Sequence, residues 1–490
     1  MPFQTVILWT DWLIYLLVAV IAVTVVYVRG REHLLAPWLR VGHSPSGMVG
    51  LTVLLLFVVV GLLDSMHYRA RLPAQAANAK IVYAAEVKSA LDALLDPLRT
   101  RREKTYSAPL ATELFAKETI ERADGSQVRD YPRLKFGGAH LKDPAAEWLP
   151  GIVRAAVGGA ASGAVIWMFV ALFVAAMLAQ TGRQNIQRSW MAIWRGETPA
   201  PWRAVLVTLL VVFLAGGALV ALAVNYHVLG TDKVGQDVLY LTLKSIRTAL
   251  VIGTLTTLVM LPFALALGIA AGYFGGWVDD AIQYLYTTLN SIPGVLLIAA
   301  AVLMMQVYID THPDLFPTAA QRADLRLLFL CIILGVTSWT GLCRLLRGEA
   351  LKLKELEYIQ AAHAFGVRHH RIISRHILPN VMHIVLISVV MEFSGLVLAE
   401  AVLSYVGVGV DPSMNSFGTM INNARLEMAR EPMVWWSLAA AFVFMVTLVL
   451  AANLFADAVR DAFDPRVRTS QQALRRRKPL PANADSKAVA

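Results

Sequence analysis

Apolar residues occur in long blocks along the chain, and most charged residues lie between the blocks. A helix needs about 20 predominantly apolar residues to cross the hydrocarbon core of a bilayer. Nine blocks approach or reach this length: residues 12–28, 48–63, 158–180, 205–224, 245–271, 282–307, 327–343, 381–401 and 433–457. The pattern therefore predicts an all-α polytopic membrane protein with about nine transmembrane helices.

The composition agrees and excludes other classes. Hydrophobic residues make up 57% of the 490 positions and charged residues only 16%, too few to cover a soluble protein of this size. A soluble enzyme, a secreted disulfide scaffold and a disordered protein are excluded. The net charge of +10 fits cytoplasmic loops facing anionic membrane lipid better than nucleic acid. Cys331 and Cys343 have no His or acidic neighbour at metal-ligand spacing, so we expect no metal or cofactor site in this chain.

The basic residues gather in alternate loops, which indicates the orientation. They lie between spans one and two, between spans three and four, after span seven and in the tail: Arg29, Arg31, Arg40, Arg183, Arg188, Arg195, Arg203, Arg344, Arg347, Lys352, Lys354, Arg368, Arg371, Arg375, Arg460, Arg466, Arg468 and 475–478. With these regions cytoplasmic, the N-terminus lies outside and the C-terminus inside. The turn with Asp279 and Asp280 would also lie inside, although it has no basic residue.

This topology places residues 64–154, the one sizeable polar block, outside the membrane. Apolar residues at helical spacing predict a helix within 74–98. Turns are expected at 124–126 and at Gly137-Gly138. We expect a small α+β or loosely folded insert that packs on the membrane domain or on a partner. It has no catalytic set, so we interpret it as a docking or stabilising unit.

The loop 344–380 is long, helical in pattern and partly apolar. Tyr358, Ala361, Ala362 and Phe365 lie at i, i+3, i+4 and i+7, which is one face of a helix. Gly366 then supplies the break expected at a helix C-terminus. Periodicity alone fits two interpretations equally: a surface offered to a cytoplasmic protein, or an amphipathic helix lying on lipid.

Five segments together resemble one family. Gln360-Ala361-Ala362, Gly366 and the ending 376–380 are similar to the EAA loop of bacterial ABC importer permeases. Four further segments narrow this resemblance to the C-type subunit of the dipeptide/oligopeptide/nickel permease family: 227–239, similar to HPLGTDxxGRDVLSR; 292–297, to IPGLLL; 400–409, to EAxLSFLGLG; and 453–466, to NLxxDxLRDxxDPR. The chain departs from the pattern at Gln360, which replaces an acidic residue, and at Val228 and Gln236.

The resemblance implies a division of the chain. Residues 203–468 would form a six-helix ABC permease core in a bacterial inner membrane. Residues 1–63 would add two N-terminal transmembrane helices, 64–154 the extracytoplasmic insert, 155–202 a third helix with a cytoplasmic linker, and 469–490 a basic tail.

The resemblance also implies partners: a B-type permease, two ATPase subunits that hold ATP and Mg, and an extracytoplasmic binding protein that delivers a peptide or a peptide-like compound. The residues that it assigns to docking on an ATPase subunit are Tyr358, Gln360, Ala361, Ala362, Phe365, Gly366 and Pro379. No G-x-x-x-x-G-K-[ST] phosphate loop occurs in the sequence, so we expect ATP hydrolysis in another chain and no enzymatic activity here.

Other polar residues have weaker interpretations. These boundaries place one acidic residue, Glu392, deep in a span, where it faces the transport pathway or, if span eight is tilted, belongs to a wet turn near Glu400. Asp232 and Asp237 fit either of two roles: binding of a partner or a cation, or capping of the following helix, for which Thr231 and Asp232 are good residues. The histidines at 363, 369, 370 and 376 fit a solvated loop better than a metal site.

Two other functions compete with an importer subunit. A stand-alone secondary transporter would show several intramembrane acids and paired broken helices. A membrane-anchored sensor would need a cytoplasmic signalling module, and the tail after residue 457 is too short for one.

Overall fold

The structure is a computed structural model, and it describes residues 3–72, 82–121, 127–183, 185–312, 316 and 318–463. The helices are α1 (Trp9–Arg29), α2 (Glu32–His43), α3 (Pro45–Ser65), α4 (Ala90–Leu94), α5 (Asp96–Thr100), α6 (Pro144–Gly182), α7 (Ile186–Arg195), α8 (Trp202–Ala223), α9 (Val238–Phe274), α10 (Gly276–Ser291), α11 (Gly294–Thr311), α12 (Ala319–Ser338), α13 (Thr340–Lys354), α14 (Glu357–Ala364), α15 (His369–Ile372), α16 (Leu378–Tyr405), α17 (Phe417–Glu427) and α18 (Trp436–Phe463). The strands are β1 (Phe3–Val6), β2 (His67–Ala70), β3 (Lys88–Ser89), β4 (Glu118–Glu121) and β5 (Gln127–Asp130).

Nine helical segments in the described ranges are long and apolar enough to cross a membrane. Helices α12 and α13 form one of these segments, and α15 and α16 form another. Helix is the structure expected of such segments, because a span must satisfy its backbone hydrogen bonds internally in lipid. The prediction of an all-α polytopic membrane protein is confirmed.

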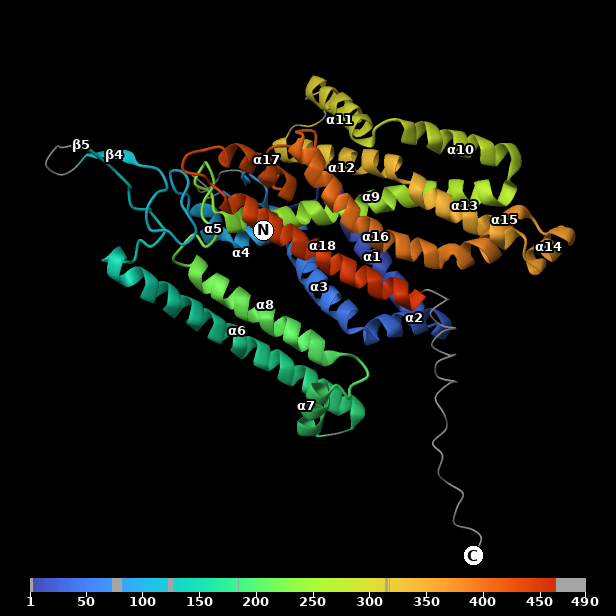
Figure 1. The fold of residues 1–490 in the computed structure, drawn as a ribbon, viewed down its shortest axis with the longest axis horizontal. Coiled ribbons are helices and arrows are strands. Elements are labelled where there is room, and N and C mark those ends of the chain that lie inside the picture. Colours follow the sequence, from blue (N-terminus) through green and yellow to red (C-terminus); the bar gives the residue numbers. More distant parts are fainter. Residues whose placement is uncertain are drawn as a thin grey trace, which may run out of the picture.

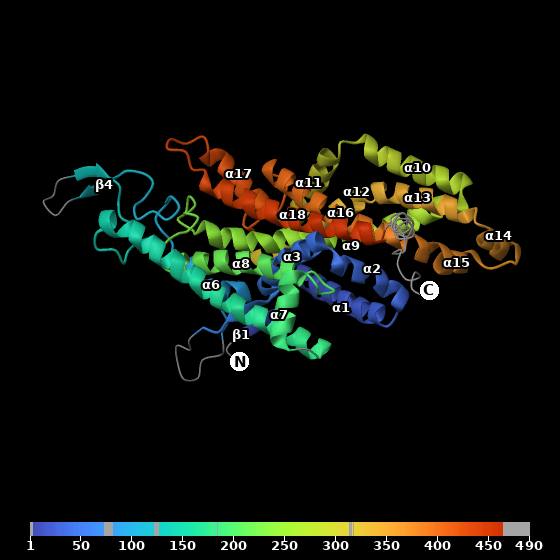
Figure 2. The ribbon, with the colours of Figure 1, turned by 60° about the horizontal axis from the view of Figure 1, so that its bottom comes forward.

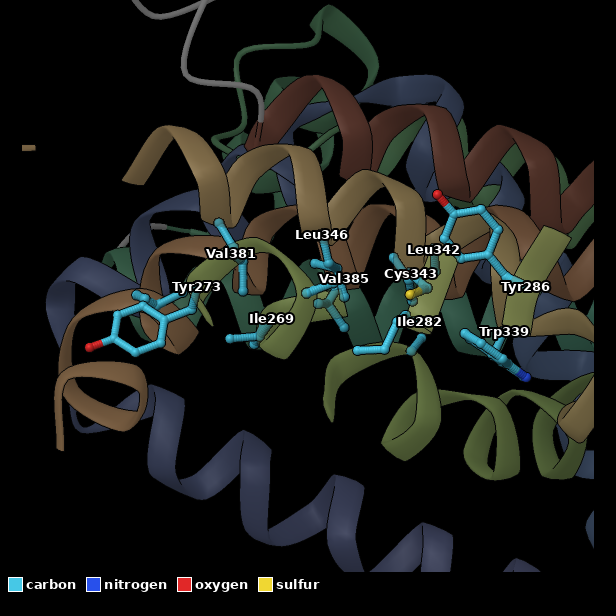
Figure 3. Packing of buried hydrophobic residues seen from close by; sticks show 14 of the residues in the cluster. Ile269, Tyr273, Ile282, Tyr286, Trp339, Leu342, Cys343, Leu346, Val381 and Val385 are labelled. Carbon is cyan, nitrogen blue, oxygen red and sulfur yellow. The ribbon is translucent and has the colours of Figure 1, made fainter. Parts of the chain in front are cut away.

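Helix α9 lies at the centre of the bundle and contacts α3, α12, α13 and α16 (Figure 1). One half of it forms a buried cluster with α10, α13 and α16, in which Ile269, Leu346 and Val381 come from three of these helices (Figure 3). The helices meet closely because α9 carries glycine at the contact. A Cβ at Gly272 would lie 2.5 Å from the backbone oxygen of Arg347 in α13.

Helices α6 and α8 form a hairpin at one edge of the bundle, with α7 between them (Figure 1, Figure 2). The hairpin also depends on glycine, since a Cβ at Gly163 would overlap the backbone of Phe213. Helix α8 contacts α3, so this pair of helices packs on the bundle mainly through one of its members.

Two predicted spans differ from the structure. Residues 282–307 do not form one helix, because α10 ends at Ser291 and α11 begins at Gly294. Pro293 offers no backbone N–H and disfavours helical geometry at the residue before it, and Ile292 is extended at φ −90° and ψ 130°. The third span is longer than predicted, since the 39-residue α6 begins at Pro144, inside the block assigned to the insert.

The insert contains short strands and helices. Strand β1, from the N-terminal segment, pairs with β2, and β2 pairs with β3. Strands β4 and β5 form a hairpin that projects away from the bundle (Figure 1). The helix predicted within 74–98 is wrong over 82–89, because these residues are not helical. Residues 74–81 and the turn predicted at 124–126 lie outside the described ranges.

Local capping explains where the first helix of the insert begins. Ser89 Oγ accepts a hydrogen bond from the Asp92 amide at 3.1 Å, and Asp92 Oδ2 accepts one from the Ser89 amide at 2.8 Å. This reciprocal cap starts α4 at Ala90. The predicted break at Gly137-Gly138 is present, with Gly138 at φ +66°.

Candidate functional site

The loop 344–380 forms a helical knob at one end of the bundle. Helix α13 ends at Lys354, α14 follows, and the chain reverses at Gly366, whose φ is +73°. The Gly366 amide donates to the carbonyl of His363 at 3.0 Å, and the Val367 amide donates to that of Ala362 at 3.1 Å. The break predicted at Gly366 is therefore an ordinary glycine helix stop. A π-helical turn, Ile373–Ile377, then leads into α16.

The predicted docking face is largely uncovered. The Phe365 side chain is 86% exposed and that of Tyr358 is 47% exposed. Ala361 is exposed as well, whereas Ala362 is partly buried and packs against the hydrophobic cluster below it. A phenylalanine left in water forfeits about 1.5–3 kcal/mol of transfer free energy, so this face gains stability when another surface covers it.

The knob rests on buried, packed side chains. Ile359, Ile372 and Ile377 are buried in the same cluster that joins α9, α13 and α16. The Tyr273 hydroxyl of α9 lies 2.8 Å from Nδ1 of His369. These contacts connect the knob to the membrane-spanning helices through one continuous buried cluster.

The other predicted docking residues lie around this face. The Tyr358 hydroxyl accepts a hydrogen bond at 3.2 Å from the side-chain amide of Asn380, next to Pro379 in the exposed first turn of α16. The Gln360 amide turns back and donates at 3.3 Å to Glu355 at the end of α13. The two limbs of the loop thus meet at Tyr358, and Gln360 lies to one side.

The histidines of the loop and Glu392 are two further groups that the sequence singled out. Among the described residues, no group of three His, Cys, Asp or Glu side chains is placed to hold a metal ion. Glu392 lies farther along α16, within the membrane-spanning segment, and is half-buried. Its carboxylate has no hydrogen-bond or ion-pair partner in the described part of the chain.

Other acidic residues lie buried nearer the ends of the membrane-spanning segments, outside the predicted spans or at their edge. Asp11 in α1, Asp324 in α12 and Glu400 in α16 are 0%, 1% and 1% exposed and lie within membrane-spanning segments. Glu400 accepts hydrogen bonds from Ser404 at 2.7 Å and Ser416 at 2.9 Å, which link the end of α16 to the start of α17.

A buried ion-pair network joins the N-terminal extension to α9. Arg247 of α9 donates to Asp11 Oδ1 at 2.6 Å and to Thr10 Oγ1 at 2.8 Å, and it lies 3.6 Å from Asp324. His67 Nδ1 lies 2.7 Å from the other oxygen of Asp11. Arg247 lies inside a predicted span, and an intramembrane cation requires an acidic partner. The need for such a partner could therefore be predicted from the sequence.

A second cation on α9 repeats the arrangement. Lys244 Nζ lies 2.5 Å from Asp64 at the end of α3 and 3.1 Å from Asp92 in α4. Tyr240 donates to Asp92 at 2.8 Å. The carboxylates that neutralise this face of α9 thus come largely from α1, α3 and the insert, which makes the extension an integral part of the bundle.

The insert is also anchored by His227, in the segment before α9. His227 Nδ1 lies 2.8 Å from Asp237 and its Nε2 lies 3.4 Å from Glu103 of the insert. Burial alone would lower the pKa of His227, but the two carboxylates raise it to about 9. Burial would raise the pKa of Glu103, but His227 and three backbone amides lower it to about 2. His227 is therefore charged at neutral pH between two carboxylates.

The cap of α9 differs from the prediction. Asp237 Oδ1 accepts hydrogen bonds from the amides of Leu239 at 2.8 Å and Tyr240 at 3.4 Å, so Asp237 is the N-cap. Thr231 instead accepts from the Ser107 amide of the insert at 2.7 Å, and Asp232 closes the turn before the helix. Thr231 therefore serves the insert interface and not the helix.

The turn at Asp279, which lacked a nearby basic residue in the sequence, receives one from α13. Arg347 Nε and Nη2 donate to the two oxygens of Asp279 at 2.5 and 2.6 Å. This two-bond pair neutralises Asp279 and joins α10 to the loop 344–380.

Comparisons with known proteins decide the family. Residues 264–469 match the model of the binding-protein-dependent transport system inner membrane component. The oligopeptide transport system permease protein OppC of Mycobacterium tuberculosis is 32% identical over 249 residues, which cover 51% of this chain and 79% of OppC. The chain belongs to the peptide-family permeases of ABC importers. The glutathione transport system permease protein GsiD of Pectobacterium atrosepticum is also 32% identical, over 50% of this permease and 74% of GsiD.

Family membership confirms the resemblance drawn from the five segments. The permease is a multi-pass inner-membrane protein and a transporter subunit, not an enzyme, and its family works with ATPase and permease partners. A chain of the inward-facing MetNI methionine ABC transporter aligns with 46% of this permease and 97% of itself, at 16% identity and a TM-score of 0.33.

Proposed function

We propose that this permease forms the pathway of an ATP-driven importer for peptides or peptide-like substrates, together with a B-type permease. Two ATPase subunits bind ATP and Mg on the cytoplasmic face, and an extracytoplasmic binding protein delivers the substrate. The names of OppC and GsiD, which refer to oligopeptide and glutathione transport, support this class of substrate.

One observation carries the coupling role. The 358–366 helix presents an exposed apolar face, with Phe365 86% exposed, above a buried support shared with α9, α13 and α16. A groove of an ATPase subunit that covers this face would move the knob when the ATPase dimer closes. Because the support is continuous, the spans would follow as a rigid body and alternate between inward and outward states.

The proposed orientation places the knob and the C-terminus in the cytoplasm, and the insert and the N-terminus outside. The basic loops support this orientation, because cytoplasmic loops carry the excess of Lys and Arg. The pairing of Asp279 with Arg347 accounts for the acidic turn at the cytoplasmic end.

A stand-alone secondary transporter is the alternative. It would require titratable groups that are free to exchange ions along a pathway within this chain. Asp11 and Asp324 are instead bound to Arg247 and Thr10, and Glu400 is bound to Ser404 and Ser416. Of these four acids only Glu392 has no partner among the described residues, and one such group is thin support for a secondary transporter.

Purification of the tagged permease in a mild detergent, with mass spectrometry of the bound proteins, tests the proposal. A P-loop ATPase and a second permease should remain bound. Recovery of this chain alone, under conditions that preserve a known ABC importer, would contradict the proposal and favour the secondary transporter.

A further inference from the structure

A small cavity lies between α11, α12 and the turn 407–412 that follows α16. Its volume is about 110 Å³, and Leu303, Met305, Phe329 and Ile333 form part of its wall. A water molecule occupies about 30 Å³ in the liquid, so the cavity has room for one aliphatic side chain but not for a whole peptide. The first three residues of the turn belong to the segment 400–409, one of the five that resemble the family, to which the proposed coupling gives no role.

The charges beside the cavity are unbalanced. Arg326 of α12 donates to Asp411 Oδ2 at 2.5 Å and to Asp310 Oδ1 at 2.9 Å, so one guanidinium faces two carboxylates. Burial alone would raise the pKa of Asp411, but hydrogen bonds from Ser413 and the charge of Arg326 lower it, so this carboxylate is ionised at neutral pH. The local excess of negative charge favours a cationic group and repels a carboxylate.

Several polar groups at the cavity have no partner. Nε of Arg326 is buried and makes no hydrogen bond. Within the described residues, the carbonyls of Gly407, Val408 and Gly409 accept no hydrogen bond, and the exposed Gln306 amide has no partner. These carbonyls can accept hydrogen bonds from an ammonium group, and the Gln306 amide can donate to a carbonyl oxygen.

We propose that this cavity is a subsite for the amino-terminal residue of a peptide, an inference that rests on the proposed function. The free α-ammonium group binds the carboxylate of Asp411 and the turn carbonyls, the first peptide carbonyl accepts from the side-chain amide of Gln306, and the first side chain enters the apolar space. The subsite requires a free amino terminus and an uncharged or apolar first side chain. An amino-acid or carboxy-terminal carboxylate is repelled by Asp310 and Asp411.

Photolabelling tests the subsite on the full chain, purified with the subunits that remain bound and placed in phosphatidylcholine nanodiscs. The probe is a tripeptide with a diazirine analogue of leucine at the first position and alanine at the other two. Its N-acetylated form, which lacks the ammonium group, is the matched probe. Mass spectrometry of the digested permease locates the adducts.

Two neighbouring substitutions provide the matched variants. Leu303 lines the cavity and is 53% exposed, so Leu303→Trp fills the space without opening the core. Met304 is 75% exposed and does not line the cavity, so Met304→Trp is the control on the same helix. Both variants retain the ion pairs of Arg326.

The free peptide should label the walls contributed by α11, α12 and the turn 407–412. Acetylation and Leu303→Trp should each reduce these adducts roughly tenfold, which corresponds to about 1.4 kcal/mol, while Met304→Trp retains them. Equal labelling by the acetylated probe, or adducts elsewhere, would overturn the subsite while a co-purified ATPase still supports the importer. Absence of an ATPase would overturn both the proposed function and the subsite.

Discussion

Two regions of the permease differ in how their side chains are satisfied. One is the interface between the N-terminal extension and α9, and the other is the knob formed by the loop 344–380. At the first, the charges of Arg247, Lys244 and their acidic partners are paired within the chain, and all but the partly buried Lys244 are buried. At the second, Phe365 and Tyr358 are exposed although they are aromatic. The charges of the first surface are paired within this chain, whereas the second is the surface that we propose an ATPase subunit covers.

We expect substitutions in the first region to change the stability of the chain, and substitutions in the second to change its assembly with other subunits. Removing a charge from a buried network leaves its partners unpaired, which destabilises the folded permease. Removing an exposed aromatic ring leaves the folded chain unchanged and removes a contact that only a complex can form. Substitutions in the two regions should therefore affect different measurements.

The largest loss of stability is expected for Arg247→Met. The change leaves Asp11 and Asp324 buried without their cation, so the free energy of unfolding should fall by about 3–5 kcal/mol. Thermal unfolding in one detergent measures the loss. Arg29→Met is the control, because Arg29 is exposed and lies in α1, the helix that also contains Asp11. Equal stability of the two variants would contradict the role given to the network.

A smaller, pH-dependent loss is expected at the insert. Because the pKa of His227 is raised from 6.5 to about 9, its ion pairs stabilise fully below pH 6.5 and are lost as the pH rises through 9. Because the pKa of Glu103 is lowered from 4.5 to about 2, its contribution is present above pH 4.5 and is lost only as the pH falls through 2. Between pH 6.5 and 9 the permease should lose about 2–3 kcal/mol.

The His227→Gln variant isolates this effect. Its thermal midpoint should vary less between pH 6.5 and 9 than that of the wild type, whereas His312→Gln, an exposed histidine after α11, should behave as the wild type. The same pH dependence in wild type and His227→Gln would identify a different titrating group.

The smallest change in stability is expected for Glu392→Gln. Glu392 is half-buried and has no partner among the described residues, so the unfolding free energy should change by no more than about 0.5 kcal/mol. If its carboxylate faces the pathway, uptake by the reconstituted transporter should slow while the subunits stay together. A large loss of stability with normal uptake would assign Glu392 to the fold instead.

The spans were predictable because nothing except membrane crossing explains such apolar blocks. The break at Pro293 was missed although the signal was present, since residue 292 before a proline disfavours helix. The helix predicted within 74–98 is present only from Ala90, as α4 and the start of α5, because the cap at Ser89 and the pairing of β3 with β2 depend on contacts that apolar spacing does not contain.

The knob was predictable because its helix, glycine stop and apolar face are local in sequence. The ion-pair network was not assembled from the sequence, because Asp11 and Asp324 fell just outside the predicted spans and lie far from Arg247 along the chain. The amino-terminal subsite likewise combines residues from three separate segments, and only the fold brings them together.

Co-purification of the ATPase with Phe365→Asp tests the central claim most directly. Phe365 is 86% exposed, so this substitution spares the fold, whereas Ala362 partly packs against the core and is a less suitable site. Leu94→Asp, at a 66% exposed leucine of the insert, is the control. We expect wild type and Leu94→Asp to retain the ATPase, and Phe365→Asp to lose it at unchanged thermal stability. Full retention of the ATPase by Phe365→Asp would contradict the assignment of this face to coupling.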